Sequence, residues 1–121
     1  MTKAASAEAP GSTLPRPVLR SASERGLGVL GVLGYGPIEW VPGRPYRHVP
    51  MPFGEAAQLQ WRGYAAAAGR ALSGRVTAWE VWDEANDGRA WQPRPDVDAY
   101  VALLRVTAAA TRGVAPSAPI V

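Results

Sequence analysis

The sequence feature that most constrains the fold is the segment at residues 76–86, which reads VTAWEVWDEAN. Apolar residues fill most of its first seven positions, as is typical of a strand buried in a parallel sheet. The apolar run then stops at Asp83 and Glu84, two adjacent carboxylates that follow Trp82. We therefore predict a buried strand over residues 75–82 with acidic side chains at its carboxyl end.

The rest of the chain alternates between helical and strand patterns. Helices are predicted over residues 17–25, over residues 55–72 and from the capping residue Asp96 to Gly113. Further strands are predicted over residues 27–33 and from Pro119 onward, where the last strand is cut short. Such alternation indicates an α/β protein with a parallel sheet and crossover helices, so we expect this chain to be part of something larger.

Composition limits the classes of site that this chain can carry. The 121 residues suffice for one small domain with a real core, expected over residues 16–121, whereas residues 1–15 are small, polar and expected to be disordered. The chain has no cysteine and one histidine, His48. Disulfides, thiolate metal sites and His-rich metal sites are therefore excluded, and no metal or cofactor is expected.

Charge and hydropathy argue against nucleic-acid and membrane partners. The net charge is +3, and twelve of the thirteen basic residues are arginines that form no dense run. No stretch approaches the roughly 20 apolar residues of a membrane span. Residues 1–10 lack the apolar core of a secretory signal, which predicts a cytoplasmic location, or an extracellular one if this amino terminus is not native.

Four segments resemble the clan A retaining glycoside hydrolases. WEVWDEAN at residues 79–86, followed by WQP at 91–93 and a Tyr-x-x-Leu-Leu helix at 96–104, is similar to the family 39-like and cellulase-like β/α barrels, whose fourth strand typically ends Trp-Asn-Glu-Pro-Asn. GLGVLGVLGYGP at residues 26–37 is similar to their third strand and its loop. The resemblance covers about residues 17–121 and implies a partial TIM (β/α)8 barrel, roughly strands three to five with their helices.

A whole barrel of this kind takes about 250 residues, so the resemblance identifies the chain as an internal fragment around the acid/base strand. A fragment leaves strand edges and apolar helix faces uncovered. We therefore expect marginal stability, weak or absent catalysis, and self-association through the exposed strand edges.

The resemblance also implies roles for individual residues. Glu84 matches the general acid/base of the hydrolases, and Asp83 stands where they have the asparagine that hydrogen-bonds the sugar. Ala85 replaces their proline, and Asn86 matches. The nucleophile of these families lies on a seventh strand, so no residue of this chain is nominated for it. The implied substrate is an oligo- or polysaccharide cleaved at an O-glycosidic bond.

Aromatic residues near the predicted site can stack against sugar rings. Tyr35, Trp40, Trp82 and Trp91 are the candidates, although Trp40 and Trp91 could instead cover the rim of the sheet. Strand alternation places Trp82 and Glu84 on the same face as Glu80, for which a structural ion pair is the simpler role.

Three other readings of the sequence remain open. The departures at Asp83 and Ala85 also suit a non-catalytic carbohydrate-binding or interaction module. A truncated or decayed reading frame would explain the missing second carboxylate. The plainest reading is an α/β domain whose acidic residues serve only its own structure, with Glu84 as a capping or surface carboxylate.

Overall fold

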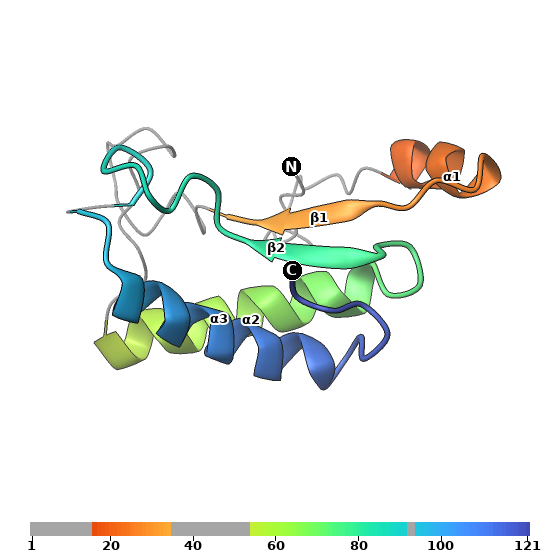
Figure 1. Cartoon of the computed structure of the whole chain (residues 1–121). Coiled ribbons are helices and arrows are strands. Elements are labelled where there is room, and N and C mark those ends of the chain that lie inside the picture. The colour runs from red at the N-terminus through yellow and green to blue at the C-terminus, as the bar shows by residue number, and fades with distance from the viewer. Residues whose placement is uncertain (1–15, 35–53, 92–93) are drawn as a thin grey trace.

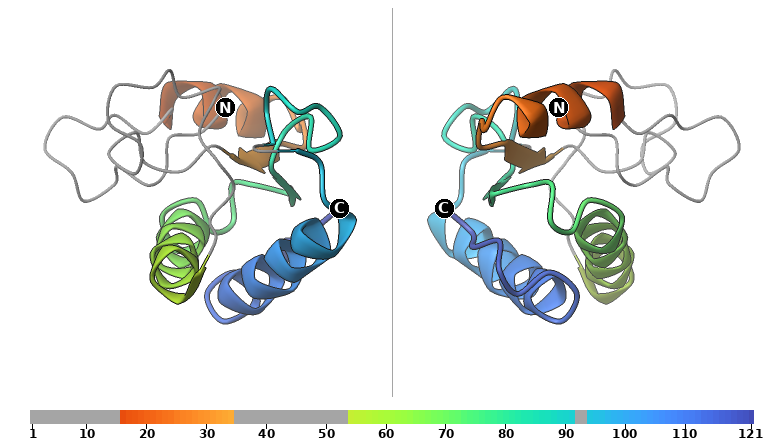
Figure 2. Two further views of the ribbon diagram at one scale, coloured as in Figure 1. Left: turned by 90° about the vertical axis from the view of Figure 1, so that its left-hand side faces the viewer. Right: turned by 90° about the vertical axis from the view of Figure 1, so that its right-hand side faces the viewer.

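The computed structural model describes residues 16–34, 54–91 and 94–121, which form a small α/β structure (Figure 1). Its elements in chain order are α1 (Arg16–Glu24), β1 (Leu30–Leu33), α2 (Gly54–Ala71), β2 (Ala78–Val81) and α3 (Val97–Arg112). Helices α2 and α3 lie side by side under one face of the sheet, whereas α1 lies on the other side (Figure 2). The loop after β2 lies at the carboxyl end of the strands, and α1 at their amino end (Figure 1).

The two strands pair in parallel, with Leu30 opposite Ala78 and Leu33 opposite Val81. A single parallel bridge extends this sheet beyond β2, between Trp79 and Ile120. There the Trp79 amide donates to the Pro119 carbonyl at 2.8 Å, and the Val121 amide donates to the Trp79 carbonyl at 2.9 Å. The strand expected at Pro119 is thus reduced to one bridge beside β2.

The expected partial TIM barrel of strands three to five is wrong. The described residues form a two-stranded parallel sheet with three helices. Closing a barrel needs a full ring of staggered strands, and two strands of four residues enclose no interior. On the face of the sheet opposite α2 and α3, Leu30 is 52% exposed. Self-association through the strand edges stays a prediction.

The helices begin and end where their sequence signals indicate. The Asp96 side chain accepts from the Ala99 amide at 3.0 Å, which caps α3 as expected. Gly26, just after α1, has a φ of +68°, and the Leu27 amide donates back to the Ala22 carbonyl at 2.9 Å. A left-handed residue of this kind suits glycine and closes a helix. The predicted helices were correct because each depends on signals within a few residues of its own ends.

The core lies between the sheet and the α2–α3 pair. Trp79 and Val81 of β2 are buried, as strand alternation predicts, and belong to one core cluster with Trp61 and Ala68 of α2. The Trp61 indole donates to the Thr107 hydroxyl of α3 at 2.8 Å, so the two helices are joined by a buried hydrogen bond as well as by packing. Within the described ranges, no helix has the length and apolarity needed to cross a membrane.

Two glycines allow a paired test of this packing. A Cβ at Gly31 in β1 would lie 2.4 Å from Cζ3 of the buried Trp79 ring, whereas a Cβ at Gly63 in α2 would meet nothing within 4 Å. We expect Gly31→Ala to destabilise the fold by about 1–3 kcal/mol, because a rigid buried ring must shift. Gly63→Ala should stabilise it by about 0.5–1 kcal/mol through helix propensity. Urea unfolding followed by circular dichroism measures both, and equal effects would contradict the packing of Trp79 on β1.

Candidate functional site

The candidate site is the loop that follows β2, residues 82–91. Two of its residues adopt left-handed backbone conformations, Trp82 with a φ of 66° and Glu84 with a φ of 52°. The loop then folds back on itself, since the Asp87 amide donates to the Glu84 carbonyl at 2.9 Å and the Ala90 amide donates to the Asp87 carbonyl at 3.0 Å. At its start, the Trp82 amide donates to the Leu33 carbonyl of β1 at 2.6 Å. The loop is therefore a compact unit attached to both strands.

The polar residues of the motif are all accessible on this loop. Asp83, Glu84 and Asn86 are exposed, and they follow directly from the carboxyl end of β2. Carboxyl ends of parallel strands are where α/β proteins place ligand-binding groups. The structure thus brings three of the residues nominated from the sequence to one surface loop.

Asp87 and Arg89 form an ion pair in the middle of the loop. The guanidinium reaches both carboxylate oxygens, with Nη2 2.6 Å from Oδ2 and Nε 3.1 Å from Oδ1. The Arg89 amide also donates to Oδ1 at 2.8 Å. These bonds from Arg89 lower the pKa of Asp87 to about 2, so this carboxylate is held in its charged form. This pair was not among the residues nominated from the sequence, although Asp-Gly-Arg is a recognisable turn signal.

Arg89 also links Glu84 electrostatically to the ion pair. The pKa of Arg89 is raised mainly by its hydrogen bonds to Asp87 and by the negative charge of Asp87. The negative charge of Glu84 raises it further. Glu84 is therefore close enough to Arg89 for the two charges to interact. Glu84, Asp87 and Arg89 form the charged cluster of this site.

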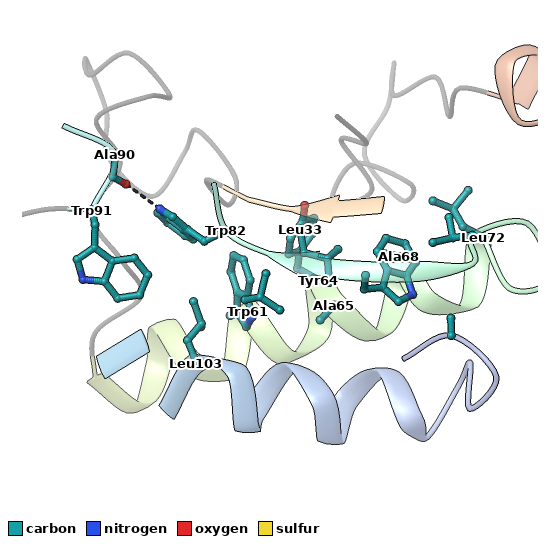
Figure 3. Packing of buried hydrophobic residues seen from close by; sticks show 14 of the residues in the cluster. Leu33, Trp61, Tyr64, Ala65, Ala68, Leu72, Trp82, Ala90, Trp91 and Leu103 are labelled. Carbon is teal, nitrogen blue, oxygen red and sulfur yellow. Dashed lines mark hydrogen bonds between the residues drawn. The ribbon is translucent and has the colours of Figure 1, made fainter. Parts of the chain in front are cut away.

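Two of the nominated aromatic residues lie in the core instead of on the loop surface (Figure 3). Trp82 is 1% exposed and Trp91 is 0% exposed. Their ring centroids are 5.3 Å apart, and the row continues from Trp82 to Trp61 at 5.7 Å and from Trp91 to Tyr100 at 5.6 Å. A stacked sugar needs an open ring face. Neither indole offers one in this structure.

Strand alternation fails at Trp82 for a backbone reason. Alternation predicted that Trp82 lies on the face of Glu80, but the left-handed conformation at Trp82 turns its side chain into the core. Its Nε1 then donates to the Ala90 carbonyl at 2.7 Å, across the base of the loop (Figure 3). Trp82 thus holds the two ends of the site loop together.

Glu80 is half-buried on β2 and forms no ion pair among the residues that the structure describes, so the expected structural ion pair is not seen there. Burial of the Tyr100 phenol raises its pKa, and the negative charge of Glu80 raises it further. That phenol donates to the Val81 carbonyl at 2.9 Å, at the end of the strand. Tyr100 therefore fastens α3 to the strand end from which the site loop departs.

The remaining nominated residues, Tyr35 and Trp40, lie outside the described residues, as do His48 and the amino-terminal segment 1–15. Within residues 16–34, 54–91 and 94–121, no three His, Cys, Asp or Glu side chains gather as metal ligands would. The comparisons with protein-family models and with curated proteins gave no match. The resemblance to the glycoside hydrolases therefore depends on the motif residues themselves.

Proposed function

We propose that the loop after β2 is a site for O-glycosides, at which Glu84 acts as the general acid/base of hydrolysis. One observation carries the proposal: Glu84 is an exposed carboxylate directly beyond the carboxyl end of a buried parallel strand. A proton donor to a bulky leaving group must be reachable by the substrate, and Glu84 meets that condition. The hydrolase-like order of residues around Glu84 supports the same role.

The chemistry assigned to the loop needs two proton transfers. Glu84 protonates the departing glycosidic oxygen as the C–O bond breaks, and later removes a proton from the water that attacks the sugar carbon. Retention also needs a carboxylate that holds the sugar between these two steps, and no residue of this chain is assigned that role. Asp83 accepts a hydrogen bond from a sugar hydroxyl, and the Asn86 amide both donates and accepts. Arg89 keeps Asp87 ionised and bound, so Asp87 serves to shape the loop.

The direct test is hydrolysis of a panel of 4-nitrophenyl β-glycosides by the whole chain. Release of nitrophenol together with a product of retained anomeric configuration, observed by proton NMR, would support the proposal. Product of inverted configuration would contradict retention. With an alkyl β-glycoside, whose leaving oxygen needs the proton, a rate no higher than that of the Glu84→Gln variant would contradict hydrolysis at this site.

Asp83→Asn is a variant that should increase the rate of hydrolysis. Asparagine can donate its amide N–H to a sugar hydroxyl, which a carboxylate cannot do, and the change removes the negative charge next to Glu84. We expect hydrolysis to rise by about 5–30-fold, as one recovered hydrogen bond of about 1–2 kcal/mol in the transition state allows. Asn86→Asp is the reciprocal control and should lower activity. A fall in activity on Asp83→Asn would show that the carboxylate itself is needed.

A second candidate is a carbohydrate-binding module without catalysis. It is favoured by the state of Asp87, a carboxylate of the same loop, which is bound by Arg89 and so unsuited to attack a sugar. Calorimetric titration with cello- and xylo-oligosaccharides separates the two candidates. A binder keeps its affinity in Glu84→Gln and releases no product with the unaltered chain.

A further inference from the structure

A cavity of about 530 Å³ lies at the end of the molecule opposite the site loop. One wall is a face of α1, and the other is Arg75 in the turn between α2 and β2. Figure 1 shows α1 and this turn together at the amino end of the strands. The cavity is lined by Arg16, Pro17, Leu19, Arg20, Ser23, Glu24 and Arg75. Its volume is that of a site for a small molecule.

The charge of this lining is unbalanced. The lining contains three arginines and one acidic residue, Glu24, so its side chains carry two surplus positive charges. Arg20 is the partner of Glu24, with Nε 3.0 Å from Oε1, and both side chains are largely exposed. In the described part of the chain neither Arg16 nor Arg75 forms an ion pair. Two guanidinium groups therefore remain available to an anion in one cavity.

We propose that this cavity binds a small phosphate ester. A phosphate monoester carries nearly two negative charges at neutral pH and so balances the surplus of the lining. One guanidinium group can bind two phosphate oxygens at once. Ser23 adds a hydroxyl that can donate to a third oxygen. The cavity is too large for a bare phosphate, and the Pro17 and Leu19 walls suit an apolar remainder.

The probes are phenyl phosphate, inorganic phosphate and benzoate, titrated into the whole chain at constant ionic strength. Binding is followed by the Nε–Hε correlations of the arginines in NMR spectra. We expect phenyl phosphate to bind most tightly, and the signals of Arg16 and Arg75 to shift with it. Equal affinity for inorganic phosphate would overturn the assignment to an ester. Equal affinity for benzoate would overturn the assignment to a dianion.

Matched variants separate a site from general attraction to basic surface. Arg75→Gln should weaken phenyl phosphate binding by about 5–20-fold, the loss of a charge-assisted hydrogen-bonding group. Arg112→Gln removes the same charge from the last turn of α3, at the same end of the molecule but outside the cavity, and should change affinity by less than about 2-fold. Equal losses in the two variants would overturn the proposal. Both residues are exposed, and circular dichroism checks that each variant is folded.

Discussion

Trp82→Ala should lower the free energy of unfolding by about 3–5 kcal/mol, the loss expected for removing a buried tryptophan. Trp82 is 1% exposed and lies in the middle of the aromatic row, against Trp61 and Trp91. Its removal also leaves the Ala90 carbonyl without the indole donor at 2.7 Å. A domain of this size has only about 5–15 kcal/mol in total, so the variant should be close to unfolding at ordinary temperature.

The measurement is urea unfolding followed by far-ultraviolet circular dichroism, since removing a tryptophan alters fluorescence directly. Trp82→Phe keeps an aromatic ring but loses the bond to Ala90, so it should cost about 1–2 kcal/mol. Leu59→Ala, at a residue of α2 that is 66% exposed, is the control and should change stability by less than about 0.5 kcal/mol. A loss below about 1 kcal/mol for Trp82→Ala would contradict the central place of Trp82 in the core.

This prediction bears on the site as well as on the core. The Trp82 indole donates to the Ala90 carbonyl near the far end of the loop, and the Trp82 backbone amide donates to the Leu33 carbonyl of β1. Glu84 lies two residues beyond Trp82, in a left-handed conformation that an L residue keeps only when its surroundings enforce it. We infer that the buried indole, which contacts no substrate, determines where the Glu84 carboxylate lies.

The elements of the fold were largely predictable because their signals are local. Asp96 caps α3 through a bond to a residue three positions away, and Gly26 closes α1 within its own turn. The prediction of a partial barrel was wrong because it did not depend on local signals of this kind. A motif of eight residues describes one strand end and its loop, whereas the number of strands in a sheet depends on pairing between distant segments. Among residues 16–34, 54–91 and 94–121, strand pairing joins β1 to β2 and adds one bridge beside β2.

The exposure of the nominated polar residues was predictable, whereas the burial of Trp82 and Trp91 was not. Asp83, Glu84 and Asn86 are exposed as expected of residues beyond a strand end. The position of the Trp82 side chain could not be predicted, because no sequence signal indicates that a tryptophan will adopt a φ of 66°. Side chains alternate between the two faces of a sheet only while the backbone is extended. In this chain the extended backbone of β2 ends at Val81.

Glu84→Gln should lower hydrolysis of an alkyl β-glycoside by about 10²–10⁴-fold, the contribution typical of a positioned general acid/base. Glutamine keeps the size and much of the hydrogen bonding of glutamate but cannot deliver a proton. The loss should be smaller for a 4-nitrophenyl glycoside, whose leaving group departs with little protonation. Azide should restore turnover of that substrate in the variant, because azide attacks the sugar without help from a base. Initial rates with the two substrates, with and without azide, measure this directly.

Two glutamates serve as controls for the proton-transfer role. Glu55→Gln makes the same change at an exposed position in the first turn of α2 and should leave the rate unchanged. Glu80→Gln tests the half-buried carboxylate of β2, which we expect to affect activity by less than 10-fold, since Glu80 precedes the site loop and acts on Tyr100. If Glu80→Gln abolished hydrolysis and Glu84→Gln did not, the acid/base would be the strand residue. The exposed loop carboxylate would then serve only to bind the sugar.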